Sequence, residues 1–172
     1  SGFDASQLYE VLPNFHNTKV RYRNFLAAVE KDVCGRAKEV EREIEWVKAH
    51  SSLSGKLVDA IASGEIPLRV THNDTKLNNV MLDDATGKGI AVIDLDTVMP
   101  GSLCYDFGDS IRFGCNTAAE DEPDLEKVHF DLGLYKVYLK GDRSAVGKGI
   151  TDEEKKELPL GALLMTYECG MP

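Results

Sequence analysis

The side chains best suited to chemistry lie within one stretch of the chain, residues 70–96. A polar loop at residues 72–79 is followed by two apolar runs, at residues 80–82 and 90–93, and a turn rich in Gly, Asp and Thr separates the runs. Two short apolar runs around such a turn predict a β-hairpin. The polar loop would then lie at the open end of the hairpin, together with the residues that follow its second strand.

The register of the hairpin decides which polar side chains meet. A four-residue turn at residues 85–88 predicts that Val80 lies opposite Ile93. One step further along the antiparallel ladder, Asn79 would lie opposite Asp94. An amide oxygen and a carboxylate are therefore expected side by side at the open end of the hairpin.

A third oxygen-bearing side chain, that of Asp74, belongs to the same polar loop. With Asn79 and Asp94 it would form a small cluster of carboxylate and amide oxygens. Mg²⁺ is a hard cation that takes such oxygens together with the phosphates of a substrate. A carboxylate beside the metal that does not serve as a ligand is free to act as a base. The cluster therefore predicts a magnesium site with a catalytic base next to it.

The spacing of these residues carries a resemblance to known proteins. His72, Asp74 and Asn79 form an H-x-D-x-x-x-x-N pattern, and Asp94 follows fifteen residues after the asparagine, at the end of an apolar run. This arrangement resembles the catalytic loop and the metal-binding aspartate of the protein-kinase-like fold. The wider sequences T-H-N-D-T-K-L-N-N-V and I-D-L-D-T-V-M-P-G-S-L-C-Y-D-F-G-D more closely resemble the aminoglycoside phosphotransferase and choline kinase superfamily. Within that superfamily, the likeness is greatest to the N-acetylhexosamine 1-kinases.

The resemblance implies an enzyme that transfers phosphate from ATP to an alcohol, here a sugar hydroxyl, with Mg²⁺ as cofactor. Asp74 would be the catalytic base or would orient the acceptor hydroxyl, and Asn79 and Asp94 would bind the metal. Lys76 matches the H-x-D-x-K pattern of serine/threonine protein kinases; its ammonium would touch the transferred phosphoryl group, or it is a solvated surface lysine. Asp96 would supplement the metal site or bind substrate, or it is a polar residue at a strand exit.

Two further residues are expected to hold the catalytic loop in place. The resemblance implies that the ring of His72 bonds to backbone near the metal-binding aspartate. Asp106 lies in the sequence D-F-G, which spells the metal-binding motif of protein kinases, but it is twenty-seven residues past Asn79 and follows no strand. The hairpin therefore cannot bring Asp106 opposite Asn79, and the resemblance implies that Asp106 holds the loop by hydrogen bonds.

Two other classes of function compete with the kinase. The sequence I-D-L-D-T-V also fits the D-x-D motif of haloacid-dehalogenase-like phosphatases, with Asp94 as nucleophile and Asp96 as acid or base. Those enzymes need a parallel α/β sheet, and no convincing strand follows Asp96. A non-catalytic interaction module with a kinase-like lobe is the other alternative. The presence of Asp74, Asn79 and Asp94 together argues against that module.

Length and composition limit the class of protein. A chain of 172 residues buries roughly two-thirds of its unfolded surface, which suits a single domain spanning residues 1–172. The formal net charge of −9 disfavours nucleic acid as a partner, because binding phosphates calls for a basic patch. The cysteines include no C-x-x-C pair, which indicates neither a zinc site nor a disulfide framework. No apolar run approaches the ~20 residues of a membrane helix, so a cytoplasmic location is expected.

The nucleotide-binding parts of a kinase are not recognisable in the sequence. No Gly-rich loop and no strand lysine paired with a helix glutamate precede the catalytic loop, and these parts normally hold ATP. The first methionine is Met81, so the chain is expected to be a piece of a longer protein. We therefore expect the C-terminal lobe of a kinase-like phosphotransferase, without its N-terminal ATP-binding lobe and inactive by itself.

The elements around the loop are expected to be mainly helical, giving an α+β fold with one small β-hairpin. Residues 68–71 have β character, and Thr151 with Glu154 forms a capping-box signature for a final helix, which Pro159 would interrupt. Gly141 would end the last of five earlier helical segments. Their apolar residues recur at helical spacing over residues 22–29, 40–47, 54–62, 103–113 and 124–139.

Overall fold

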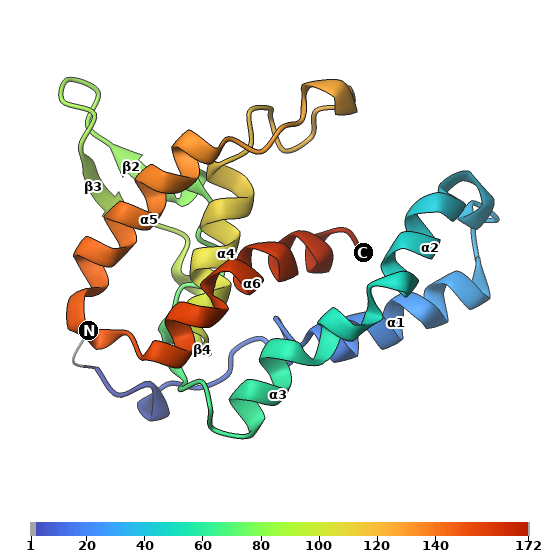
Figure 1. Cartoon of the computed structure of the whole chain (residues 1–172), viewed down its shortest axis with the longest axis horizontal. Coiled ribbons are helices and arrows are strands. Elements are labelled where there is room, and N and C mark those ends of the chain that lie inside the picture. The colour runs from blue at the N-terminus through green and yellow to red at the C-terminus, as the bar shows by residue number, and fades with distance from the viewer. Residues whose placement is uncertain (1–2, 172) are drawn as a thin grey trace.

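The structure is a computed structural model that describes residues 3–171, apart from the side chains at positions 143, 146 and 148. It is mainly helical with two small antiparallel sheets, which confirms the predicted fold class (Figure 1). Among the described residues, none of the helices combines the length and the apolar character needed to cross a lipid bilayer. The elements are α1 (Thr18–Lys31), α2 (Glu41–Ala49), α3 (Lys56–Ala62), β1 (Arg69–Thr71), β2 (Val80–Leu82), β3 (Gly89–Val92), β4 (Met99–Gly101), α4 (Leu103–Gly114), α5 (Leu132–Val146) and α6 (Asp152–Cys169).

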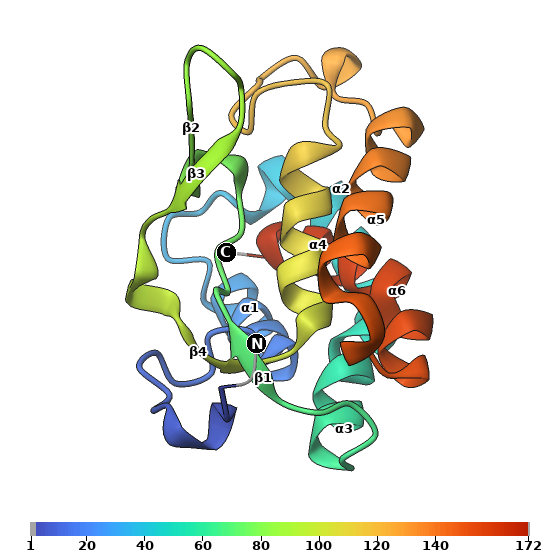
Figure 2. The same cartoon turned by 90° about the vertical axis from the view of Figure 1, so that its left-hand side faces the viewer.

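Helices α4 and α6 form the centre of the molecule and touch backbone to backbone (Figure 2). A Cβ atom on Gly108 of α4 would lie 2.3 Å from the carbonyl oxygen of Gly161 on α6. One on Gly161 would lie 2.2 Å from the carbonyl oxygen of Cys104. Glycine is the residue that permits so close an approach of two backbones. The crossing fixes α4, the helix that carries Asp106.

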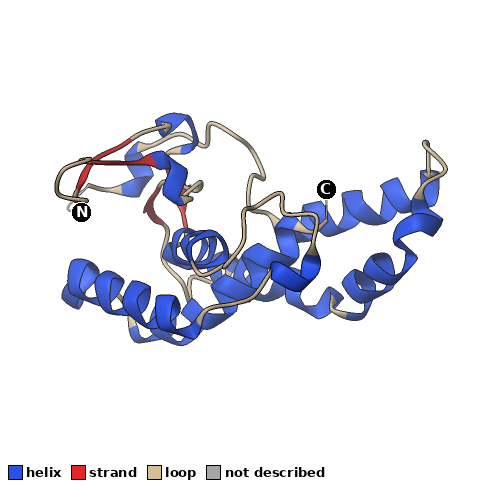
Figure 3. Ribbon diagram, turned by 90° about the horizontal axis from the view of Figure 1, so that it is seen from above, coloured by secondary structure: helices blue, strands red, loops and turns tan. Residues whose placement is uncertain are grey.

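Helices α1 and α2 project from this centre as a helical arm (Figure 3). The hydroxyl of Tyr167 on α6 donates to the carbonyl of Val47 on α2 at 3.1 Å, and both residues are buried. Ile44, also on α2, is buried as well, whereas Trp46 is about half exposed at 46%. The arm is therefore joined to the centre along the apolar face of α2, as its helical spacing predicts.

The first turn of α6 carries the predicted capping box, which is confirmed. The side chain of Thr151 accepts from the N–H of Glu154 at 3.1 Å, and the Glu154 carboxylate accepts from the N–H of Thr151 at 2.8 Å. Arg69 of β1 donates hydrogen bonds from Nε and Nη2 to the same carboxylate, at 2.5 and 2.6 Å. Glu154 is fully buried. The start of α6 is thereby tied to the strand that leads into the polar loop.

The predicted interruption at Pro159 is wrong, because α6 continues through it to Cys169. Proline removes one helical hydrogen bond, here the bond to the carbonyl of Lys155. Both residues are exposed, and at an exposed position a free helix carbonyl can bond to solvent.

A second sheet, which the sequence did not predict, pairs β1 with β4. Val70 lies opposite Pro100, and Thr71 lies opposite Met99. The hydroxyl of Thr71 also donates to the carbonyl of Met99 at 3.0 Å. This pairing returns the chain after the hairpin to the base of the polar loop, so the loop is held between two sheets.

The predicted hairpin of residues 80–82 and 90–93 is present, but its predicted register is wrong by one residue. Val80 pairs with Val92 rather than Ile93. The N–H of Ile93 bonds to the carbonyl of Asn79 at 2.9 Å, so Ile93 takes the place opposite Asn79. Asp94 lies one residue further on, with a left-handed φ of 64°.

The turn explains this error. Asp83 closes the turn one residue earlier than predicted, because its Oδ1 accepts from the N–H of Thr86 at 2.8 Å and its N–H donates to the carbonyl of Lys88 at 2.8 Å. Pairing Asp83 with Lys88 alone would shift the register by two residues, and a bulge between Met81 and Leu82 takes one of them back, so the net error is one residue.

The last helix segment predicted before the capping box, residues 124–139, begins and ends later in the structure. Helix α5 begins after Asp131, whose carboxylate accepts from the N–H of Gly133 at 2.6 Å and so caps the first turn. Gly141 does not end the helix, which continues to Val146.

Candidate active site

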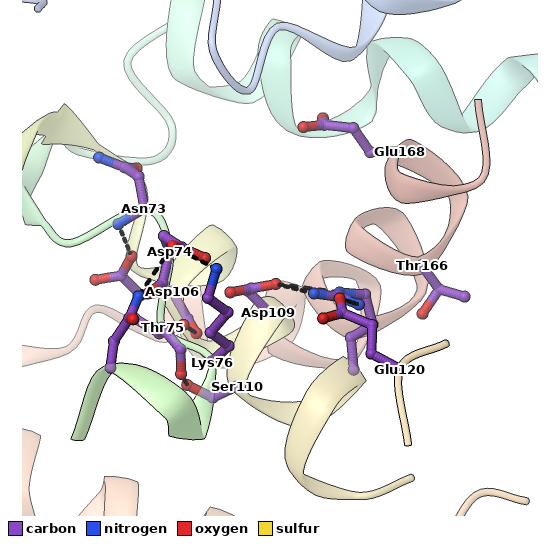
Figure 4. A network of polar contacts seen from close by, with 12 residues as sticks. Asn73, Asp74, Thr75, Lys76, Asp106, Asp109, Ser110, Glu120, Thr166 and Glu168 are labelled. Carbon is purple, nitrogen blue, oxygen red and sulfur yellow. Dashed lines mark hydrogen bonds and ion pairs between the residues drawn. The ribbon is translucent and has the colours of Figure 1, made fainter. Parts of the chain in front are cut away.

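The polar loop of residues 72–79 is supported by the carboxylate of Asp106 on α4 (Figure 4). Oδ2 of Asp106 accepts from the N–H of His72 at 2.9 Å, and Oδ1 accepts from the N–H of Asn73 at 2.7 Å. The carbonyl of Asp106 accepts from the hydroxyl of Thr75 at 2.6 Å. Burial raises the pKa of Asp106, while the two backbone N–H groups favour its charged form. Asp106 therefore fixes the start of the loop.

Asn73 turns the chain sharply just before Asp74. Its φ of 65° is in the left-handed region, which asparagine tolerates better than most residues. Its side chain donates to the carbonyl of Thr97 at 3.0 Å and is buried. The backbone at this turn sets the direction in which Asp74 leaves the loop.

Asp74 is the centre of the polar contacts in the loop. Its Oδ2 accepts from Nδ2 of Asn79 at 2.9 Å and lies 3.1 Å from Nζ of Lys76. The same Nδ2 donates to the backbone carbonyl of Asp74 at 2.8 Å. Within the described part of the chain, no hydrogen bond reaches Oδ1 of Asp74. One carboxylate oxygen is thus fixed, and the other is open to a hydroxyl that approaches the loop.

The ring of His72 connects the loop to the residue before Asp94. Its Nδ1 accepts from the N–H of Asp74 at 3.3 Å, and its Nε2 lies 3.0 Å from the carbonyl oxygen of Ile93. A carbonyl oxygen only accepts, so this arrangement suits the ring tautomer that donates from Nε2. His72 therefore contacts the backbone of the residue before Asp94. That this contact helps to hold the loop for catalysis stays a prediction.

Asp94 and Asp96 are exposed neighbours at the open end of the hairpin. A hydrogen bond and the charge of Asp96 raise the pKa of Asp94; the charge of Asp74 acts in the same direction, and that of Lys76 opposes it. The four charged groups are therefore close enough to influence one another. A divalent cation would favour the ionised form of both neighbouring carboxylates.

The oxygen donors at this end fit a hard cation that brings its own further ligands. Over residues 3–171, no group of three or more His, Cys, Asp or Glu side chains is placed to hold a metal. The donors available are the carboxylates of Asp94 and Asp96 and the amide oxygen of Asn79, whose Nδ2 is engaged by Asp74. Mg²⁺ is commonly bound by one or two carboxylates together with water and substrate phosphates. The donor set suits a metal of that kind.

Lys76 brings a positive charge to Asp74. The hydrogen bond with Asp74 raises the pKa of Lys76, burial opposes this, and the charges of Asp74, Glu120 and Asp94 add to the rise. The lysine side chain is 32% exposed. The Lys76 ammonium therefore stays charged, and it lies against the Asp74 carboxylate rather than in bulk solvent.

A polar network on α4 borders the site and was not predicted from the sequence (Figure 4). Oδ1 of Asp109 accepts from Nε and Nη2 of Arg112 at 3.1 and 3.0 Å, while its buried Oδ2 has no partner among the described residues. Arg112 also donates from Nη1 to Glu120 at 2.8 Å. The spacing of Asp109 and Arg112 could have predicted their ion pair, because residues three apart on a helix lie on the same face.

A buried pair, His16 and Glu168, reaches the loop from outside the predicted site. The two side chains meet at 2.7 Å although 152 residues separate them. Nε2 of His16 lies 2.9 Å from the carbonyl oxygen of Asn73. No signal in the sequence joins two residues so far apart, and neither was predicted to take part.

The comparison with known families agrees with this geometry. The model of the phosphotransferase enzyme family, APH, matches residues 4–139. That range includes the polar loop, the hairpin, Asp94, Asp96 and Asp106. It covers well over half of the chain, and the helical lobe described above is of the kind found in kinase-like folds. The chain therefore belongs to the phosphotransferase enzyme family.

Proposed function

We propose that the chain is the catalytic-loop lobe of an ATP- and Mg²⁺-dependent kinase that phosphorylates a sugar hydroxyl, with an N-acetylhexosamine as acceptor. The observation that carries the proposal is the state of Asp74. Asn79 and Lys76 hold one of its carboxylate oxygens, and the other has no partner within the described residues. A base needs this combination of a fixed direction and an open oxygen. Family membership supports the reaction class, and the resemblance described above supports the sugar.

In the proposed mechanism, three side chains of the loop and the two nearby aspartates each have a task. Oδ1 of Asp74 accepts a hydrogen bond from the acceptor hydroxyl and takes its proton as the acceptor oxygen bonds to the γ-phosphorus of ATP. The bond from the γ-phosphorus to the bridging oxygen of the β-phosphate breaks, and ADP leaves. The ammonium of Lys76 balances the negative charge that develops on the transferred phosphoryl group. Asn79 and Asp94, with Asp96 beside them, would hold Mg²⁺, which when bound neutralises charge on the phosphates of ATP.

The surroundings of Asp74 support an acceptor with several hydroxyl groups. Arg112 is engaged by Asp109 and Glu120, and the Glu120 side chain, which is 52% exposed, offers acceptors. The hydroxyls of Thr75 and Ser110 lie in the same network (Figure 4). A sugar both donates and accepts hydrogen bonds, so it would use both kinds of group.

The proposal includes a further lobe that binds the adenine and the rest of the nucleotide. The hairpin supports the presence of such a lobe, because large apolar side chains of the hairpin are exposed to solvent in this chain. Met81, Ile90 and Val92 are 48%, 63% and 56% exposed. Such a surface favours contact with another part of the protein or with a planar ligand.

The phosphatase alternative has little structural support. Both sheets of the described chain are antiparallel pairs of strands, and Asp94 follows a strand of the hairpin. The parallel α/β sheet on which that chemistry depends is not among the elements of residues 3–171.

The experiment is an acceptor panel with the complete protein. ATP and Mg²⁺ are supplied with N-acetylglucosamine, N-acetylgalactosamine, glucose, choline, homoserine or an aminoglycoside, and products are followed by phosphorus NMR. We expect a new sugar phosphate with an N-acetylhexosamine. Transfer to choline, homoserine or an aminoglycoside alone would refute the sugar as acceptor, and transfer to none would refute the kinase.

A further inference from the structure

His16 lies between two hydrogen-bond acceptors in the interior. Its Nδ1 is 2.7 Å from Oε1 of Glu168 on α6, and its Nε2 is 2.9 Å from the carbonyl oxygen of Asn73. The side chains of His16 and Glu168 are 9% and 1% exposed. The ring of Tyr105 on α4 stacks on the imidazole, with centroids 4.9 Å apart. The ring is therefore fixed in position and orientation.

Both oxygens of the Glu168 carboxylate are held by neighbouring side chains. Thr18 donates its hydroxyl to Oε2 at 2.7 Å, and Nε of Arg21 lies 3.2 Å from Oε1. With His16, three side chains thus contact this carboxylate. A carbonyl oxygen also only accepts, so His16 satisfies both of its partners when each ring nitrogen carries a proton.

The contact of His16 is with the peptide group that leads into the catalytic residue. That peptide joins Asn73 to Asp74, and its oxygen is held by His16. Its N–H is held by Nδ1 of His72 at 3.3 Å. One histidine thus fixes each end of the peptide group, directly after the left-handed turn at Asn73. Rotation of this peptide would redirect the Asp74 carboxylate.

We infer that His16, held by Glu168, is a positioning residue for phosphoryl transfer, because it fixes the peptide between Asn73 and Asp74. The inference rests on the proposed function. The pair connects the last turn of α6 and the segment before α1 to the catalytic loop. Asp74 is aimed at the acceptor only while that connection is intact, and binding of either substrate does not depend on it.

The kinetic test compares two variants of the complete protein. The double variant His16→Phe with Glu168→Gln removes the bond to Asn73, keeps a ring against Tyr105 and leaves no buried charge without a partner. The control Thr18→Val removes a buried bond to the same Glu168 carboxylate but none to the loop. We expect the double variant to lower kcat about 10- to 100-fold with KM for both substrates unchanged. The control should keep the kcat of the native protein.

The outcomes separate positioning from general destabilisation. A double variant with native kcat, or a Thr18→Val control that loses kcat equally, would overturn the inference. His16→Gln provides a rescue, since its amide still reaches the Asn73 carbonyl, and it should retain more kcat than the double variant. Equal losses in the two would also contradict the role assigned to the bond.

A measurement independent of activity distinguishes failure of this inference from failure of the proposed function. Nitrogen-15 NMR of the native chain should show protons on both ring nitrogens of His16. The amide resonance of Asp74 should move in the double variant and stay in place in Thr18→Val. These results would support the inference even if the acceptor panel yields no product. A neutral His16, or an unmoved Asp74 amide in the double variant, would overturn it.

Discussion

Replacement of Gly161 by alanine tests the packing that places the polar loop. The new Cβ would lie 2.2, 3.0 and 3.3 Å from the O, C and Cα atoms of Cys104, all of them backbone. Carbon–oxygen contacts in proteins are about 3.3 Å or longer, so α4 and α6 would have to separate by about 1 Å. Overpacking of this kind costs about 2–3 kcal/mol. We therefore expect a clear loss of stability.

Urea denaturation measures this loss. With a denaturant slope of about 2 kcal/mol per molar, the midpoint should fall by about 1–1.5 M. Gly141→Ala is the matched control, because Gly141 lies inside α5 with no atom within 4 Å of a new Cβ. That variant should gain about 0.5–1 kcal/mol. An unchanged midpoint for Gly161→Ala would refute the backbone contact between the two helices.

Three further outcomes are expected. Burial opposes ionisation of Glu154, but Arg69 and Thr151 outweigh it and hold the pKa of Glu154 below its ordinary value of 4.5. Stability should therefore fall as the pH drops below that value, and acid urea titrations of Glu154→Gln should show a smaller fall; an equal fall would contradict the pairing. If the proposed function holds, Asp94→Asn should raise the Mg²⁺ concentration for half-maximal activity by ~10–100-fold, whereas an unchanged requirement would remove Asp94 from the metal site. Calorimetry with the present chain alone should show weak ATP binding, with no turnover in a coupled assay; turnover would refute the need for a further lobe.

Local signals in the sequence predicted local structure correctly. Thr151 and Glu154 are three residues apart, and their reciprocal bonds form within one turn. In the loop, Asp74 and Asn79 were expected in one cluster; they are five residues apart and bond directly, although that bond itself was not predicted. Short separations of this kind leave few alternative geometries, so residue type and spacing suffice.

The hairpin register and the start of α5 were predicted wrongly because a single side chain or a distant segment determines the local structure there. The turn of the hairpin is closed by Asp83 rather than by the next residue, and the register shifts with it. Residues before α5 do not continue the helical pattern, because Phe130 forms a β-bridge with Asn116 and Asp131 caps the helix instead. Neither choice is visible in hydrophobic spacing.

Support for the site from distant segments could not be predicted at all. His16 and Glu168 meet across 152 residues, and their meeting depends on how α6 packs against α4. The pairing of β1 with β4 likewise joins segments on either side of the hairpin. In a single sequence, such contacts leave no pattern of spacing. Residue chemistry thus indicated the loop, whereas the groups that fix it required the fold.

The most direct measurement of the proposed kinase activity is the turnover of Asp74→Asn, with ATP, Mg²⁺ and the best acceptor of the panel. Asparagine keeps the size of the side chain and removes its ability to take a proton. We expect kcat to fall about 100- to 10,000-fold, while circular dichroism and Tm stay close to those of the native protein. A variant that folds normally and turns over at the native rate would contradict the account, because Asp74 would then have no part in the reaction.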